Sequence, residues 1–281
     1  MSLLESKNPL VRKGTATALQ LAKFPIRLIT REQEYAERPP IIVNSLPKSG
    51  THLLLQLARA IPETRYLGGF IAHAWSVTLH ERSPHAIHQR LGRLLPGEVT
   101  GAHIKYHPET AIWLQKHPIV HLFIYRDPRD VILSEEAYVT EMAPWHRLHR
   151  VLRRASDREE RLRLLIEGVP GLIDDIRKRV RSFTTWLKEE DVISVRYEDL
   201  AGDERDATIR LIAERICRTA PLYGPPDHLA KRMEKAIAPE RSHTFREGGV
   251  GKWRTRLPTN LFQRIMELAG NDIVNLGYPE N

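Results

Sequence analysis

The sequence predicts an α/β fold, a single domain in which helices flank a central parallel β-sheet. Two short runs of apolar, largely β-branched residues, 41–43 and 119–125, indicate buried strands. A helix-forming stretch follows each run, and strands that alternate with helices favour a parallel sheet with right-handed crossovers. In such sheets ligands bind at the carboxyl ends of the strands. The residues that follow each strand are therefore the first candidates for a functional site.

The composition restricts the classes of function that this chain can have. The chain has 281 residues, 41% of them hydrophobic, which is enough for a sizeable core. Its net charge of +8 favours anionic ligands, acidic polymers or anionic membrane surfaces. The single cysteine, Cys217, excludes an intrachain disulfide and a cysteine-based zinc site. Because the sequence shows neither a signal peptide nor an apolar run of ~18–20 residues, we expect a cytoplasmic protein.

Residues 1–38 are basic and amphipathic, and we interpret them as an N-terminal helical extension interrupted at Pro25. A segment of this kind either makes a peripheral contact with a membrane or packs on its own domain. Pro39 and Pro40 end it and lead into the first strand. We assign residues 39–281 to one domain, because no repeat, low-complexity tract or internal boundary divides them.

A short loop between the first strand and the next helix is the first candidate site. It contains Lys48, Ser49, Gly50, Thr51 and His52. A strand, a tight loop and a helix in this order direct free backbone N–H groups at an anion, and Lys48 adds positive charge. The loop lacks the Walker A order, in which Lys comes last beside Ser or Thr. It is either a cradle for phosphate or sulfate or simply a basic turn.

The segment 64–97 has scattered Gly and Pro and is expected to be irregular and partly helical. A short strand is expected to follow and to end near His103, with a helix at 109–116. Lys48, His103 and Arg126 then lie at or just after the ends of predicted strands. We expect these three side chains to converge on one crevice.

The run from Arg126 to Ser134 is the second candidate site. Asp127 is a good N-cap and Pro128 a good first residue of a helix. Ser134 follows Arg126 by eight positions, or about two helical turns, on the face that carries Asp127 and Asp130. An Arg fork and a Ser hydroxyl together can bind a phosphate. The alternative is a capped helix with a surface Arg–Asp pair.

The second half of the chain is predicted to contain one more strand and several helices. Residues 140–190 are helical and rich in Arg, and form either an acceptor lid or plain scaffold. A strand is expected at 192–197. Near the end, the glycine-rich stretch 245–254 lets backbone N–H groups approach a ligand closely, although a flexible basic loop explains it equally well.

Four separated segments, Pro47–Thr51, Arg126–Ser134, Val195–Asp199 and Arg246–Arg254, together resemble the family of sulfotransferases that use 3′-phosphoadenosine-5′-phosphosulfate (PAPS). This family includes cytosolic and bacterial members with a P-loop-like phosphosulfate loop. The resemblance covers about residues 40–275. It implies an enzyme that transfers the sulfuryl group of PAPS to a hydroxyl or amine of an acceptor, without a metal ion.

The resemblance also implies how the nucleotide is held. Residues 48–52 would bind the 5′-phosphosulfate, with Lys48 also catalytic, and Arg126 and Ser134 would bind the 3′-phosphate. Tyr197 would lie near the adenine. The remaining contacts would come from three residues that close over the nucleotide: Arg246, Glu247 and Gly248.

The family's catalytic base is a His at the end of a strand between the first two motifs, which leaves His103 and His107 as candidates here. His103 precedes Arg126 by 23 residues, close to the family's interval, and we prefer it. The Lys that normally precedes this His is missing, because Gly101 and Ala102 stand there.

Two other classes remain open. An ATP-dependent small-molecule kinase would need a Walker A order or an Asp placed for magnesium, and Asp127 is the one loose candidate. A non-catalytic nucleic-acid or membrane-binding module would use the basic surface and would bind polymers in a salt-sensitive way. Under the sulfotransferase interpretation we expect no nucleic-acid partner, and the acceptor is a small molecule, a lipid or a glycan.

Overall fold

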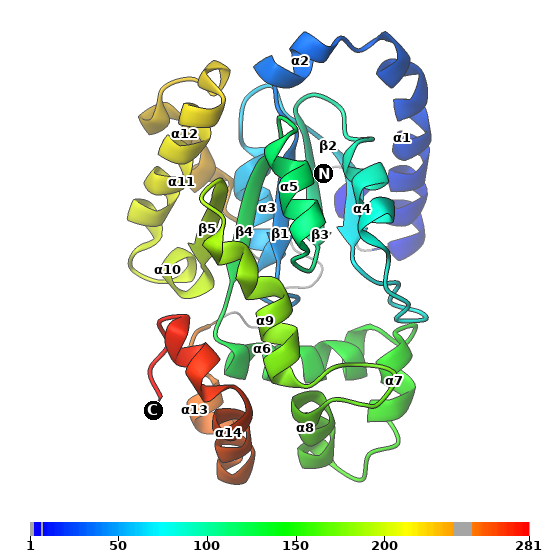
Figure 1. Cartoon of the computed structure of the whole chain (residues 1–281), viewed down its shortest axis with the longest axis vertical. Helices are drawn as coiled ribbons and strands as arrows, with labels where there is room; N and C mark the ends of the chain where they lie inside the picture. Colours follow the sequence, from blue (N-terminus) through cyan, green and yellow to red (C-terminus); the bar gives the residue numbers. More distant parts are fainter. Residues whose placement is uncertain (1–2, 7, 239–248, 281) are drawn as a thin grey trace.

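A five-stranded parallel sheet runs through the middle of the molecule (Figure 1). The computed structural model describes residues 3–6, 8–238 and 249–280. The strands lie in the order β2-β3-β1-β4-β5, and each pairs in parallel with its neighbours. Their bounds are β1 Ile41–Ser45, β2 Arg65–Ala72, β3 Glu98–His103, β4 Val120–Tyr125 and β5 Val192–Arg196. The predicted fold class is confirmed.

The presence of β2 corrects one prediction. Residues 64–97 were expected to be irregular and partly helical, but Arg65–Ala72 form a strand. The strand lacks a regular apolar alternation and contains Gly68 and Gly69. Its register with β3 shifts between Tyr66 and Phe70, and Gly68 takes a φ of 70°. Such a bulge breaks the period of two on which strand recognition rests. A further helix, α4 (Pro84–Leu91), follows in the same segment.

Side chains of the strands alternate between two apolar layers, as the period of two requires. Ile41 and Val43 pack on one face, and Ile42 packs on the other. The first face is covered by α3 (Thr51–Arg59), α10 (Tyr197–Ala201), α11 (Arg205–Thr219) and α12 (Pro226–Ala236). The second face is covered by α4, α5 (Pro108–Gln115) and α9 (Ile176–Thr184).

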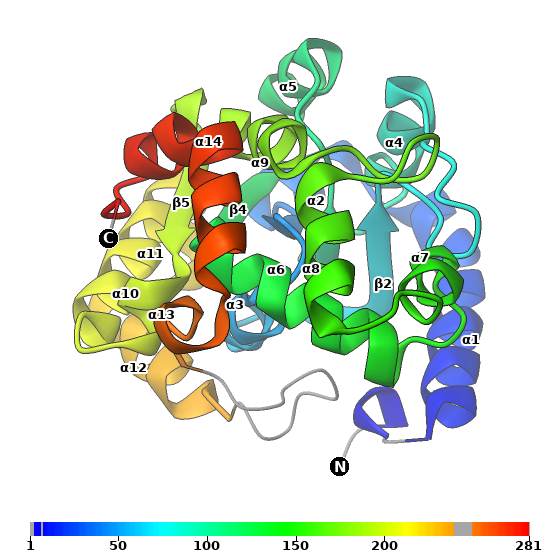
Figure 2. The same cartoon turned by 90° about the horizontal axis from the view of Figure 1, so that it is seen from below.

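A further group of helices lies beyond the lower end of the sheet in Figure 1 and is seen from below in Figure 2. It has an apolar cluster of its own, which includes Leu133, Leu165 and Ile265. Its members are α6 (Pro128–Ala137), α7 (Arg147–Leu152), α8 (Arg158–Glu167), α13 (Trp253–Arg256) and α14 (Thr259–Asn275). Because α6 begins just after β4, this group faces the carboxyl ends of the strands.

The N-terminal segment forms α1 (Pro9–Ile29) and α2 (Glu32–Glu37). The expected break at Pro25 is wrong, since α1 continues past it. Contacts with the sheet hold the helix: Lys23 forms a buried ion pair with Glu98 at 2.7 Å. A proline weakens a helix interior, but tertiary contacts of this kind can keep the helix intact. In the described parts of the chain no helix is both long and apolar enough to cross a membrane.

Candidate functional site

A cavity of about 1760 Å³ lies between the carboxyl ends of the strands and the lower group of helices. Its wall comes from segments far apart in the sequence, including α1, the loop after β1, α6 and the turn at 167–176. Most of the predicted site residues that the structure describes line this one cavity: Lys48, Gly50, Thr51, His52, His103, Arg126, Ser134 and Tyr197. The expected convergence of strand ends is confirmed.

The loop after β1 has the geometry of an anion cradle. Lys48 and Gly50 both take a left-handed backbone, with φ of 69° and 93°, and α3 begins at Thr51. A Cβ on residue 50 would lie 2.5 Å from Cδ2 of Tyr197, so only glycine fits. Ser49 is fully buried, and its Oγ finds no hydrogen-bond partner among the described residues. A buried hydroxyl without a partner in such a loop fits a ligand that accepts its hydrogen bond.

The Lys48 ammonium lies 4.0 Å from the ring centroid of Tyr138, the first residue of a widened helical turn that continues α6 to Met142. Burial lowers the pKa of Lys48 to about 8, and the Arg126 guanidinium acts in the same direction while Glu135 opposes it. The side chain is therefore cationic at neutral pH and loses its charge in mildly basic solution. Glu135 and Tyr138 follow Ser134 by one and four positions, beyond the run from Arg126 to Ser134 that was predicted as a site.

His103 ends β3 and is oriented by Ser45, the last residue of β1. Its Nδ1 lies 3.2 Å from the backbone carbonyl of Ser45 and 3.0 Å from the Ser45 hydroxyl. Because a carbonyl only accepts, this contact assigns the hydrogen to Nδ1 and leaves Nε2 to accept a proton. The Ser45 hydroxyl also contacts Thr51 Oγ1 at 2.6 Å. A chain of hydroxyls thus joins the loop after β1 to the imidazole.

Burial lowers the pKa of His103 to about 3, and His73, His52 and Lys48 push it in the same direction, against the hydrogen bond to the Ser45 carbonyl. Phe70 packs edge-on against the ring, with centroids 4.8 Å apart. His103 is therefore a neutral imidazole at physiological pH, which is the form that a general base requires.

His107, the other candidate, lies outside this cavity. Its exposed side chain caps α5, where Nδ1 accepts a hydrogen bond from the backbone N–H of Glu109 at 3.3 Å. His107 is not among the cavity-lining residues, and its imidazole already has a structural role.

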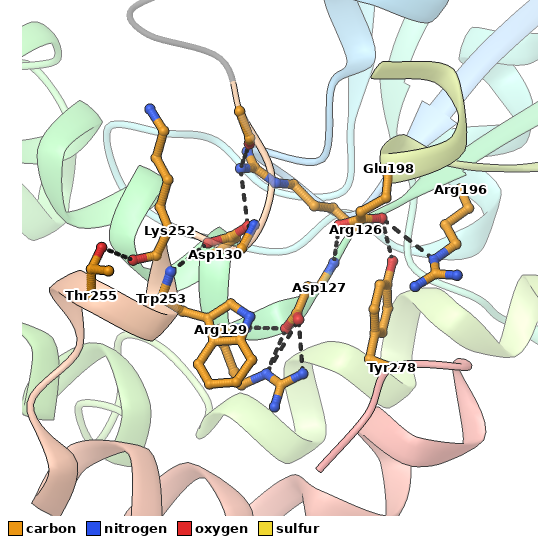
Figure 3. A network of polar contacts seen from close by, with 12 residues as sticks. Arg126, Asp127, Arg129, Asp130, Arg196, Glu198, Lys252, Trp253, Thr255 and Tyr278 are labelled. Atoms are coloured by element: carbon orange, nitrogen blue, oxygen red, sulfur yellow. Dashed lines mark hydrogen bonds and ion pairs between the residues drawn. The ribbon is translucent and has the colours of Figure 1, made fainter. Parts of the chain in front are cut away.

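Arg126 joins the cavity to the C-terminal segment (Figure 3). Its Nη2 donates to the carbonyl of Gly249 at 2.8 Å and lies 3.4 Å from Asp130. The guanidinium also stacks on the ring of Tyr197, 4.5 Å from its centroid. Asp130 in turn accepts hydrogen bonds from the backbone N–H groups of Gly251 and Trp253 at 2.8 and 2.9 Å. Residues 249–253 are thus anchored beside Arg126.

A second layer of ionic contacts holds the start of α6 (Figure 3). Asp127 caps the helix, as predicted, by accepting from the N–H of Arg129 at 2.9 Å, and its carboxylate also binds the Arg129 guanidinium at 2.9 Å. The backbone N–H of Asp127 donates to Glu198 at 3.0 Å, and the Tyr278 hydroxyl donates to the same carboxylate at 2.7 Å. These contacts fix the backbone next to Arg126.

Three predicted residues, Arg246, Glu247 and Gly248, lie outside the described residues. The sequence analysis also missed residues that border the site. Ser45 was not predicted as a site residue, although a polar residue at the carboxyl end of a buried strand is a candidate for such a role. His73 directly follows β2, a strand that was not predicted. Its backbone N–H donates to the His103 carbonyl at 2.7 Å.

Comparison with known proteins gives the family. The family model described as sulfotransferase domain matches residues 38–214. A search of curated proteins finds no significant match.

Three solved structures share the fold at low identity. A mouse sulfotransferase, SULT7A1, in complex with PAP is 18% identical, with a TM-score of 0.54 over 88% of this chain and 94% of that one. Retinol dehydratase with androsterone and the inactive cofactor PAP is 14% identical, with a TM-score of 0.55 over 91% of this chain and 85% of that one. Retinol dehydratase with retinol and PAP is also 14% identical, with a TM-score of 0.52 over 91% and 86%. The match over 38–214 confirms the resemblance noted from the four motifs, and the chain belongs to the sulfotransferase family.

Proposed function

We propose that this protein transfers a sulfuryl group from PAPS to a hydroxyl or amine of a small amphipathic acceptor, with His103 as the general base. The main support for the proposal is that Lys48, His103 and Arg126, which come from the ends of three strands, line the same cavity. The neighbouring structures hold PAP, the desulfated donor, in the same fold. PAPS would supply the activated sulfuryl group.

The residues around the cavity fit a nucleotide with phosphates at both ends. The loop 48–52 offers backbone N–H groups, the Lys48 ammonium and the Ser49 hydroxyl, which has no partner in the described part of the chain, to the 5′ group. Arg126 and Ser134, on the other side, would bind the 3′-phosphate. The Nε of Arg126 is buried without a partner among the described residues, which leaves a charged donor for an anion. Tyr197 would border the adenine, and Arg246, Glu247 and Gly248 would close over it.

In the proposed mechanism the protein holds PAPS and the acceptor in place, removes a proton from the acceptor hydroxyl and stabilises the charge that develops on the leaving phosphate. Nε2 of neutral His103 accepts the proton of the acceptor hydroxyl. Lys48 and the N–H groups of the loop stabilise the negative charge that grows on the leaving phosphate. Each group is held before the reaction: His103 by Ser45, and Lys48 by the ring of Tyr138. Such preorganisation is the main source of catalysis in group transfer of this kind.

We infer that the acceptor has an apolar body and a polar group. The cavity is lined by Phe70, whose ring packs on His103, and by Trp145, Leu172, Lys105 and Glu81. Trp145 and Leu172 belong to 140–190, which supports the role of this segment as an acceptor lid within a sulfotransferase domain of residues 39–281. The bound androsterone and retinol of the neighbouring retinol dehydratase are apolar molecules with polar ends.

Titration calorimetry with PAP, ATP and duplex DNA separates this proposal from the kinase and the basic binding module. We expect PAP to bind, ATP to bind at least about tenfold more weakly because it lacks the 3′-phosphate, and DNA to show no saturable binding. A preference for ATP would favour the kinase, and strong salt-sensitive DNA binding would favour the module.

The Ser45→Ala variant tests how His103 is positioned. The substitution removes the hydroxyl that contacts His103 and Thr51 but leaves the backbone carbonyl in place. We expect kcat to fall about 3–10-fold, the value of one ordinary hydrogen bond, with KM for PAPS little changed. Ser45→Thr should restore the rate. A rise in KM without a change in kcat would show that Ser45 acts on the nucleotide loop alone.

The lowered pKa of Lys48 predicts how nucleotide binding depends on pH. Because this pKa is about 8, the free protein loses the Lys48 charge as the pH rises through that value. PAP affinity should therefore be constant near pH 6.5–7 and fall between pH 7.5 and 9. Calorimetry across this range measures the effect, with Lys48→Arg as the control that keeps its charge and a flat profile. An equally steep fall in Lys48→Arg would assign the titration to another group.

A further inference from the structure

Helix α1 presents an apolar face to solvent instead of to the protein. Leu10, Leu21 and Leu28 lie within about 20° of one line along the helix, and they are 81%, 73% and 72% exposed. Phe24, about 40° from this line, is 72% exposed, and Ile29, the last residue of the helix, is 80% exposed. An amphipathic surface helix normally turns this face toward the core. These side chains form an exposed apolar strip along the helix, and exposed apolar side chains gathered on one face mark an interaction surface.

The opposite face of α1 is fixed on the domain, so the apolar face cannot simply rotate inward. Lys23 is buried in an ion pair with Glu98, and Gln20 donates to the carbonyl of Leu67 at 3.1 Å. Ala16 packs so closely on Gly68 that a Cβ there would lie 2.8 Å from the Ala16 methyl. Figures 1 and 2 both show α1 along an outer edge of the molecule, beside β2.

The charges of α1 point to the chemistry of the partner. Its 21 residues include Arg12, Lys13, Lys23 and Arg27 but no Asp or Glu. Lys13 and Arg27, both exposed, lie 14 residues apart on one edge of the apolar strip, which separates them by about 21 Å along the helix. An apolar strip bordered by cations is complementary to an anionic lipid surface.

We propose that α1 lies flat in the surface of a bilayer that contains anionic lipids, with Leu10, Leu21, Phe24 and Leu28 inserted among the acyl chains. A second copy of the chain fits this face less well. In an antiparallel pair of α1 helices the same edge of each helix would face its counterpart. Lys13 of one copy would then meet Arg27 of the other, with no acidic residue of α1 to neutralise them.

Docking through α1 would bring the cavity to the membrane surface, because Arg12 and Ala16, on the inner side of this helix, and Lys13, at the edge of the apolar strip, also line the cavity. This consequence concerns the proposed function, but the docking itself does not depend on it. Vesicle binding requires neither PAPS nor an acceptor, so each of the two proposals can fail independently of the other.

Co-sedimentation with vesicles tests the docking. We expect the wild-type chain to bind vesicles of phosphatidylcholine with 30% phosphatidylglycerol, and to bind pure phosphatidylcholine vesicles much more weakly. The double variant Leu21→Glu/Phe24→Glu should lower this binding at least about tenfold, since two large apolar side chains no longer insert. Arg27→Gln should weaken it less and reduce its dependence on anionic lipid. The control is Leu211→Glu, which changes an exposed leucine on α11, on the opposite side of the molecule (Figure 1), and should bind as the wild type does.

An unchanged melting temperature of the double variant establishes that it is folded. Equal vesicle binding by the wild type and the folded double variant would overturn the proposal, as would no binding of the wild type to anionic vesicles. Light scattering of the same samples tests the alternative that a second copy of the chain covers this face. If the wild type were a dimer and the double variant a monomer, the apolar face would be assigned to that second copy.

Discussion

The His103→Ala variant is expected to lose about 10²–10⁴-fold in kcat while its PAP affinity stays close to that of the wild type. The imidazole lies at the end of β3, with its Nδ1 3.2 Å from the Ser45 carbonyl, so Nε2 is available to accept a proton. The nucleotide contacts proposed for the loop 48–52 and for Arg126 do not involve this side chain. Single-turnover rates with labelled PAPS and calorimetry with PAP measure the two quantities.

The matched control is His107→Ala. This imidazole caps α5 and lies outside the cavity, so its loss should cost a little stability and leave turnover nearly unchanged. Nearly full activity of His103→Ala, together with an inactive His107→Ala, would transfer the role of base to His107.

The pH profile of the wild type adds a second test of the base. Burial first, and then His73, His52 and Lys48, hold the pKa of His103 at about 3, so the imidazole stays neutral as the pH falls through 6.5. The acid limb of kcat/KM, which reports the free enzyme, should therefore lie well below the ordinary imidazole value. A limb centred near pH 6.5 would contradict the buried, neutral base.

The Arg126→Ala variant is expected to bind PAP about 10–100-fold more weakly and adenosine 5′-phosphate almost as well as the wild type does. The two ligands differ only in the 3′-phosphate, which the proposal assigns to Arg126 and Ser134. Ser134→Ala should shift the same ratio in the same direction by a smaller factor.

Arg126 also donates to the carbonyl of Gly249 and stacks on Tyr197. The informative quantity for this variant is therefore the ratio of its affinities for PAP and adenosine 5′-phosphate. A general loosening of the site would weaken both ligands. An equal loss for PAP and adenosine 5′-phosphate would refute the assignment of the 3′-phosphate to Arg126.

The sequence was sufficient for those parts of the fold whose signals are local. Buried strands such as β4 are mainly apolar runs, and the start of α6 is marked by an N-cap and a proline, Asp127 and Pro128. Parallel strands then place the residues after each strand at one edge of the sheet. This geometry is why Lys48, His103 and Arg126 could be grouped from their positions in the sequence alone.

The sequence was insufficient where tertiary contacts override a local signal. β2 carries a bulge at Gly68 and little alternation, and its pairing with β3 makes it a strand. α1 passes through Pro25 because the buried Lys23–Glu98 pair holds it on the domain. The role of Ser45 follows from the register in which β1 lies beside β3, and no local pattern of residues encodes that register.

A crystal structure of the complex with PAP is the most direct test of the proposed site. We predict that the 5′-phosphate contacts the loop from Lys48 to His52, that the 3′-phosphate contacts Arg126 and Ser134, and that His103 faces the 5′ end. PAP bound elsewhere on the molecule, or bound in the cavity with its 3′-phosphate away from Arg126, would contradict it.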